Sequence, residues 1–364
     1  MTIRDITDYL ETLAPASLQE SYDNCGLLTG SHDTKLKGIL VTLDCTEEVV
    51  DEAIRHRCNL IVAHHPIIFK GLKRLTGASY TERAVIKAIK NDIAIYAIHT
   101  NLDNVRQGVN AEIAGRIGLQ RCSVLLPKEG TLCKLYTFIP VKDFARVAAE
   151  VFKAGAGHIG NYSETSFRTL GTGTFRGNEN TNPAIGQRGV LEEVEEVKFE
   201  TIFPAYLQHK VVAALLRAHP YEEVAYDVVP LKNTHAGIGS GLIGDLPKPM
   251  EELLFLKKLK KQMQAACIRH TALRGKPVQR VAVCGGAGSF LLKTALTAGA
   301  DVFITADFKY HEFFDAENRL IIADIGHYES EQFTRDRIAA LISEKFPNIA
   351  PLISKINTNP VHYL

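Results

Sequence analysis

The sequence predicts an α/β protein in which two related α/β halves form one core, with a ferredoxin-like (βαββαβ) domain inserted between them. Both ends of the chain alternate continuous apolar runs with amphipathic helical patterns, and connections of this length are typical of βαβ units. The middle follows a different order of strands and helices between two turn-rich segments. A chain of 364 residues is also too long for one ordinary core.

The N-terminal half is expected over residues 1–126. Its strands are expected at residues 37–45, 59–65 and 93–103, and its helices at 46–57 and 81–92. Thr46 suits a helix N-cap, and the acidic Glu47 and Glu48 suit the first turn. Because the apolar runs are continuous rather than alternating, we expect parallel strands that are covered on both faces.

The inserted domain is expected over residues 131–230, and the C-terminal half over 240–364. Strand and helix patterns in the middle follow the order βαββαβ, which is the ferredoxin-like order. The C-terminal half returns to strands that end in polar groups, at residues 279–289, 300–312 and 318–331. The two halves look alike in style, but no residue-level repeat supports a duplication.

Composition excludes several classes of protein. Apolar residues make up 46% and charged residues 23%, and the net charge is +1, so electrostatics gives no case for a nucleic-acid or anionic-membrane partner. No apolar stretch approaches the ~18 residues of a membrane span, and the first residues lack the features of a signal peptide. Seven cysteines without C-x-x-C spacing indicate free thiols, and we expect a cytoplasmic location.

The stretch "LIVAHHPIIFKG" (residues 60–71) places His64 and His65 at the end of an apolar strand. Neighbouring strand residues point to opposite faces, so the two imidazoles can reach one site only where the strand ends. Pro66 supplies that break, at the strand end where α/β sheets build their sites. The alternative is one buried, hydrogen-bonded histidine beside an exposed one.

Two further strands end in the same way. "IHTNLD" (residues 98–103) carries His99 and Asp103, although Asp103 alone would also suit a turn or a helix N-cap. "ADIGHYESEQF" (residues 323–333) carries His327 and Glu331, whose spacing of four places both on one helix face. An isolated pair of this kind is a weak signal, because any helix surface can produce one.

Together these motifs predict a metal centre. Three imidazoles and two carboxylates without a thiolate suit Zn, Mn, Fe, Co or Ni. Five ligands exceed the needs of one open catalytic ion and fit two divalent metal ions per chain, about 3.5–4 Å apart with one carboxylate bridging. The predicted ligands are His64, His65, Asp103, His327 and Glu331.

The motifs "VAHHPIIFKGL", "IHTNLD" and "GHYESE" resemble those of the Nif-three-like family of GTP cyclohydrolase I type 2 homologues. "DNCGLLTG" (residues 23–30) fits its N-terminal signature, and "HPYEEVAYDVV" (residues 219–229) resembles the P-II/CutA-like insert of its long form. The resemblance implies that His65 and Asp103 bind one ion, that His64 and His327 bind the other, and that Glu331 bridges them. It also implies a homohexamer and GTP or another nucleotide as substrate.

Several polar segments have more than one interpretation. His99 could carry protons or be a core histidine. Asp307 and His311 in "TADFKYHE" could support the metals, transfer protons or contact substrate, or belong to a solvated loop. The glycines of "VCGGAGS" (residues 283–289) could hold a phosphate or form a tight turn. The acidic run at residues 191–200 is expected to be a solvated strand face, and "HPYEEVAYDVV" could bind a regulator or form a domain edge.

The predicted function is that of a metal-dependent hydrolase. Two ions lower the pKa of bound water toward 7 and can direct a hydroxide at a nucleotide or a cyclic amide-like substrate. The family resemblance suggests GTP, whereas the residues alone would equally serve a phosphoesterase or an amidohydrolase. The alternative is a non-catalytic metal-binding scaffold or regulatory hexamer. No nucleic-acid or membrane partner is expected.

Overall fold

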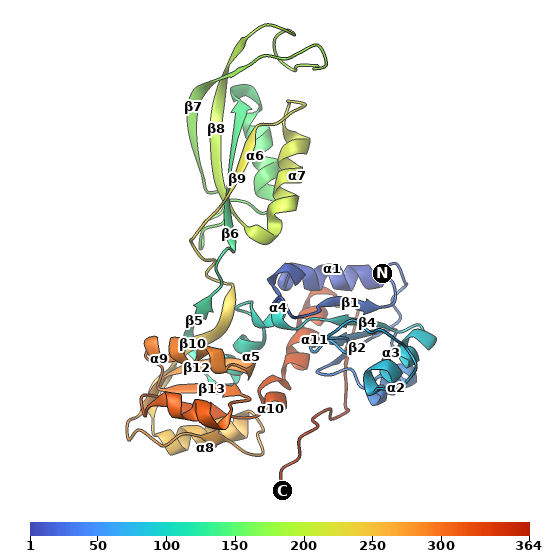
Figure 1. Cartoon of the computed structure of the whole chain (residues 1–364), viewed down its shortest axis with the longest axis vertical. Coiled ribbons are helices and arrows are strands. Elements are labelled where there is room, and N and C mark those ends of the chain that lie inside the picture. Colours follow the sequence, from blue (N-terminus) through green and yellow to red (C-terminus); the bar gives the residue numbers. More distant parts are fainter. The chain divides into compact units, whose positions relative to one another are not determined.

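The computed structural model describes all residues, 1–364 (Figure 1). The chain divides into two compact units. One contains residues 1–127 and 237–364, and the other contains residues 128–236. All five predicted metal ligands belong to the first unit.

The first sheet of this unit has the strand order β1-β4-β3-β2-β15. Strands β15, β2, β3 and β4 run parallel to one another, and β1 is antiparallel to β4. Every residue of β2, β3 and β4 is buried, as the continuous apolar runs predict. The strands are β1 (Gly26–Thr29), β2 (Ile39–Thr42), β3 (Leu60–Ala63), β4 (Ala94–Ala97) and β15 (Leu352–Ile353).

The second sheet has the strand order β11-β14-β13-β12-β10-β5. Only the pairs β12–β13 and β13–β14 are parallel, and the outer pairs are antiparallel. The strands are β5 (Gln120–Pro127), β10 (Gly239–Met250), β11 (Arg269–His270), β12 (Val278–Ala287), β13 (Val302–Ala306) and β14 (Ile321–Asp324).

Each of the two sheets has an edge strand from a distant part of the chain. β15, near the end of the chain, pairs with β2 of the first sheet, and β5, from the first half, pairs with β10 of the second. An exposed strand edge carries unpaired N–H and C=O groups, and each of these strands satisfies one such edge. The sequence boundaries at 126 and 240 therefore do not separate two self-contained sheets.

Helices cover both sheets. Buried side chains of α1 (Ile3–Leu13), α5 (Val109–Ile117), α8 (Glu252–Gln262) and α11 (Thr334–Lys345) join one hydrophobic core with strands of both sheets. α2 (Glu47–Arg55) and α3 (Tyr80–Lys90) pack on the other face of the first sheet, and α9 (Leu292–Thr297) packs on the second. The core that α1, α5, α8 and α11 share with both sheets fixes the two sheets relative to each other.

The predicted helix N-cap at Thr46 is confirmed, because the Thr46 hydroxyl accepts a hydrogen bond from Val49 N.

The second unit contains a four-stranded antiparallel sheet, β7-β8-β6-β9. Along the chain its elements are β6 (Leu132–Pro140), α6 (Phe144–Lys153), β7 (Ser166–Phe175), β8 (Glu192–Pro204), α7 (Gln208–Ala218) and β9 (Tyr226–Pro230). Both helices share a separate hydrophobic core with one face of the sheet. None of the helices in either unit combines the length and apolar character that crossing a membrane requires.

Candidate metal centre

The five predicted ligands converge where three parallel strands end. His64 and His65 directly follow β3, and Asp103 ends α4 (Thr100–Asp103), which begins three residues after β4. His327 and Glu331 begin and end α10 (His327–Glu331), three residues after β14. Carboxyl ends of parallel strands meet at one edge of a sheet, and the shared core brings the edges of the two sheets together.

His64 is completely buried. Its Nδ1 lies 2.8 Å from the carbonyl oxygen of Ile98 and donates to it, which leaves Nε2 facing Asp103 Oδ1 at 3.6 Å and Glu331 Oε2 at 4.0 Å. Burial lowers the pKa of His64 to about 3, so the ring is neutral and Nε2 carries a lone pair. Burial and the nearby charge of Glu331 raise the pKa of Asp103 well above its usual value.

A second group forms around the same carboxylate oxygen. His65 Nε2 and His327 Nε2 lie 3.0 and 3.1 Å from Glu331 Oε2, and 3.4 Å from each other. The other nitrogen of each ring is held by an aspartate. His65 Nδ1 lies 2.8 Å from Asp44 Oδ1, and His327 Nδ1 lies 2.6 Å from Asp307 Oδ2. Carboxylates in this position fix the orientation of metal-binding imidazoles.

In this second group, each imidazole lies between two carboxylates that favour its protonated form. Burial opposes protonation of His65, but hydrogen bonds to Asp44 and Glu331 outweigh it and raise its pKa to about 10. Burial also opposes protonation of His327, but the charge of Glu331 and the hydrogen bond to Asp307 raise its pKa to about 11. Although burial alone would raise the pKa of Glu331, the two imidazoles lower it well below its usual value. Glu331 is therefore an ionised carboxylate.

The residues fit a metal centre on a direct observation. His64 Nε2 and Asp103 Oδ1 are buried and have no hydrogen-bond partner, and both lie beside Glu331 Oε2. An unsatisfied buried polar group is costly, and these three atoms face one another with lone pairs available. Two groups of potential ligand atoms share the Glu331 carboxylate, namely His64–Asp103–Glu331 and His65–His327–Glu331.

This grouping differs from the pairing that the family resemblance implied. The expected pairs were His65 with Asp103 and His64 with His327, whereas the structure groups His64 with Asp103 and His65 with His327. The reason lies in the strand end. His64 turns inward toward the neighbouring β4–α4 connection, and His65 turns toward α10 of the other half. Proximity alone does not assign ligands to one ion or the other, so the implied pairing stays a prediction.

The three tentative residues lie in different positions. His99 lies beside the centre, with its ring centroid 5.2 Å from that of His64 and 5.1 Å from that of His65. Asp307 contacts His327 directly. His311 belongs to neither ligand group, and its exposed ring stacks on Phe314 instead, with the centroids 6.4 Å apart.

Two supporting carboxylates were not among the predicted site residues. Asp44 holds His65, and Asp23 accepts hydrogen bonds from His99 Nδ1 at 2.9 Å and from the amide and hydroxyl of Thr100. Asp44 lies two residues after β2, so the same rule of polar groups at strand ends could have identified it. Asp23 lies in the "DNCGLLTG" signature, where the sequence alone gives no chemical role.

The glycines of "VCGGAGS" make room for Glu331. A Cβ atom on Gly286 would lie 2.5 Å from Glu331 Oε1, and one on Gly285 would lie 3.3 Å from Glu331 Cγ. Gly286 also has a φ of +63°, which glycine adopts without strain. Its amide donates to the Ser330 hydroxyl at 2.9 Å. Of the two interpretations of this segment, these contacts favour the tight turn.

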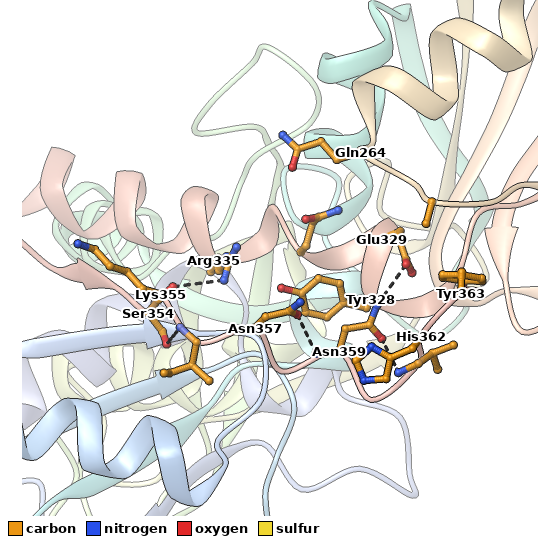
Figure 2. A pocket seen from close by; sticks show the side chains of 14 residues that line it. Gln264, Tyr328, Glu329, Arg335, Ser354, Lys355, Asn357, Asn359, His362 and Tyr363 are labelled. Carbon is orange, nitrogen blue, oxygen red and sulfur yellow. Dashed lines mark hydrogen bonds between the residues drawn. The ribbon is translucent and has the colours of Figure 1, made fainter.

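A polar hollow of about 470 Å³ adjoins α10 (Figure 2). Tyr328 and Glu329, which lie between the two ligand positions of α10, line it together with residues near the end of the chain. Asn359 Nδ2 donates to Glu329 Oε1 at 3.2 Å, and the neighbouring Thr358 hydroxyl donates to Asp44 Oδ2. The C-terminal segment thus contacts Asp44, which holds His65, and Glu329 of α10.

Comparison with known proteins decides the family. The model of the Duf34/NIF3 (NGG1p interacting factor 3) family matches residues 1–360. The chain belongs to the DUF34/NIF3 family. It is 40% identical to a DUF34/NIF3 relative from Halalkalibacterium halodurans named "GTP cyclohydrolase 1 type 2 homolog", covering 99% of this chain and 98% of that protein. A relative of the same name from Bacillus subtilis is 36% identical over 99% of this chain and 98% of its own.

Solved structures agree with this DUF34/NIF3 assignment. A Bacillus cereus protein related to NIF3 superposes with a TM-score of 0.86 at 39% identity, covering 100% of this chain and 99% of that one. The protein TTHA1606 from Thermus thermophilus has a TM-score of 0.57 at 15% identity, covering 99% and 100%, and so shares the fold. The mixed α/β architecture is therefore that of the DUF34/NIF3 proteins.

Proposed function

We propose that this chain is a metal-dependent hydrolase whose centre holds two divalent ions bridged by Glu331. The observation that carries the proposal is the position of Glu331 Oε2. This buried oxygen lies 3.0 Å from His65 Nε2 and 3.1 Å from His327 Nε2 and is common to both groups of potential ligand atoms. A carboxylate shared by two sets of nitrogen and oxygen donors is what a bridged pair of borderline cations requires.

Each part of the protein has a separate task in this proposal. When bound, two ions of Zn, Mn, Fe, Co or Ni would activate water and polarise the substrate. Asp44 and Asp307 orient His65 and His327 through their Nδ1 atoms. His99 is held at Nδ1 by Asp23, so its Nε2 remains for exchanging a proton with the substrate, and we assign that role to it. His311 has no assigned role.

Substrate class, domain organisation and assembly extend the proposal. The names of the relatives make GTP or another nucleotide the first substrate to test. Residues 128–236 are proposed to be an inserted ferredoxin-like domain of the P-II/CutA type, supported by the order of its elements and by the pairing of Pro127 with Gly239. A homohexamer is proposed from the family resemblance and can be tested by light scattering. The seven free cysteines support a cytoplasmic location.

Metal loading and turnover provide the test. Protein reconstituted with Zn, Mn or Co should contain about two ions per chain by elemental analysis. It should hydrolyse at least one of GTP, a phosphodiester or a cyclic amide, and chelation should abolish this activity. Two bound ions without turnover would overturn the hydrolase and leave the metal-binding scaffold. A folded chain that binds no ion would overturn both.

A further inference from the structure

The unit of residues 128–236 contains a hollow of about 650 Å³. Its walls come from β7, from the segment that follows β7, from the open face of β8 and from the residues after α7. The rings of Phe138, Phe175 and Tyr221 line it, and the centroids of Phe175 and Tyr221 lie 5.8 Å apart. Its volume is within the range of small-molecule sites, and aromatic rings form part of its wall.

A buried carboxylate lies in the wall of this hollow. Glu196 is only 7% exposed, although the acidic run that contains it was expected to be a solvated strand face. Its neighbour Glu195 is exposed, as expected. Strand β7 leaves room for the buried group, because a Cβ atom on Gly173 would lie 2.1 Å from Glu196 Oε2.

Glu196 has fewer partners than a buried acid normally has. It accepts one hydrogen bond, from the Tyr221 hydroxyl to Oε1 at 2.8 Å, and forms no ion pair. Lys198 also lines the hollow, but its Nζ lies 3.1 Å from Glu200 instead. A buried charge is costly unless it is paired and hydrogen-bonded, so Glu196 lacks a cation.

The nearby histidine does not supply that cation. His219 Nε2 donates to the Phe138 carbonyl oxygen at 2.9 Å, and Nδ1 accepts from Tyr221 N at 3.2 Å. Accepting at Nδ1 requires the neutral ring. Glu222 and Glu223 add further carboxylates to the lining, with Arg176 as the one remaining basic residue. Arg176 is exposed and makes no ion pair with Glu196.

We propose that this hollow binds a flat aromatic ligand that carries a cationic amine or amidine, with the cation on Glu196 and the ring against Phe175 and Tyr221. Charge decides the class, because the buried group without a cation is a carboxylate. Aromatic walls and the bare backbone of Gly171 and Gly173 accept a planar ring. This site is separate from the metal centre and is independent of the proposed hydrolase activity. It gives "HPYEEVAYDVV" a binding role, through Tyr221.

A matched pair of probes tests the proposal on the full-length chain. Benzamidine carries the cation and benzamide is its neutral counterpart of nearly the same shape. By titration calorimetry, benzamidine should bind at least about tenfold more tightly than benzamide, because a charge-assisted hydrogen bond is the stronger kind. Glu196→Gln keeps the size of the side chain and should reduce this ratio to near one. Glu195→Gln removes the same charge from the opposite face of β8 and should leave the ratio unchanged.

A second variant separates binding from folding. Phe175→Ala should weaken both probes by a similar factor, because it removes a ring surface but no charge. Metal content and circular dichroism of all three variants should match those of the original chain. Failure of benzamidine to bind the original chain, or an unchanged ratio in Glu196→Gln, would overturn the proposal.

Discussion

His65 and His327, the two imidazoles that contact Glu331, are each held by an aspartate, but the two pairs differ in their exposure to solvent. His65 and Asp44 have side chains 18% and 34% exposed, whereas His327 and Asp307 are 40% and 50% exposed. We call Thr358–Asp44–His65 the inner arm and Asp307–His327 the outer arm. The inner arm contains one more hydrogen-bonded residue, because Asp44 also accepts a hydrogen bond from Thr358. The comparison teaches that equal contacts need not have equal effects, because solvent can replace an exposed partner more readily than a buried one.

Glu331 belongs to both arms, and its replacement should have the largest effect. Glu331→Gln should weaken binding at both positions by more than about 100-fold, above the range for losing an outer partner. The amide keeps the size of the side chain but loses the negative charge that two cations would share. Metal stoichiometry by elemental analysis after dialysis would measure this. Retention of two ions would show that Glu331 does not bridge.

Single-arm substitutions should be less severe and should reveal the pairing. His327→Ala should leave the His64–Asp103–Glu331 group intact, so that the chain retains about one ion of the expected two. His64→Ala should instead spare the group of His65 and His327. X-ray absorption spectra of the two singly loaded variants would distinguish them, because one retains a single imidazole and the other two. Identical spectra would contradict the grouping seen here.

The supporting aspartates test the difference in depth directly. Asp44→Asn should reduce metal affinity more than Asp307→Asn does, within the 10–100-fold range typical of such partners. Water can approach the His327 ring when Asp307 is changed, but His65 is more enclosed. Competition titration against a chelator gives both affinities under the same conditions. An equal loss in the two variants would show that burial does not distinguish the arms.

The sequence predicts the five ligands better than their supports for a physical reason. Carboxyl ends of parallel strands converge, so His64, His65 and Asp103 could be placed together from apolar runs alone. Asp44 follows a strand too, but a lone carboxylate after a strand also suits a turn. Its role depends on His65, and that contact exists only in the folded chain. How the ligands divide between two ions could not be derived from the strand pattern, because it depends on which way each ring turns where β3 ends.

The distant edge strands and the buried acid show another limit. β15 has two residues, which is too short to carry a periodic signal, and its partner β2 lies more than 300 residues earlier in the chain. Glu196 lies in an alternating acidic strand, a pattern that indicates a solvated face. Its burial arises because the chain after β7 and the residues around Tyr221 close over that end of the sheet. The pattern of residues along one strand cannot predict burial by segments that are distant in the sequence.

Thr358 provides a finer test of the inner arm. Thr358→Val keeps the shape of the side chain but removes the hydroxyl that donates to the Asp44 carboxylate, and a hydrogen bond to a charged group contributes about 1.5–3 kcal/mol. Only part of this loss should reach the metal, because Thr358 acts through Asp44 and His65. Metal affinity should fall by a factor of about 2–10, less than in Asp44→Asn. Thr358→Ser, which retains the hydroxyl, should bind metal like the original chain. Loss in both variants would point to packing of the methyl group instead.

The smallest expected effect is that of removing residues 128–236. All residues of both arms lie in the other unit, and the ends of the removed segment are close together, because Pro127 and Gly239 are paired neighbours in the β5–β10 ladder. A short Gly/Ser linker between residues 127 and 237 can therefore close the gap without moving either strand.

The shortened chain should fold, bind about two ions and keep the difference between Asp44→Asn and Asp307→Asn. Circular dichroism and elemental analysis would measure this, with the full-length chain prepared in parallel as the control. A folded, soluble deletion variant without metal would mean that residues 128–236 help to build the centre. If the shortened chain binds two ions but Asp44→Asn and Asp307→Asn reduce its metal affinity equally, residues 128–236 affect how far one of the two arms is buried.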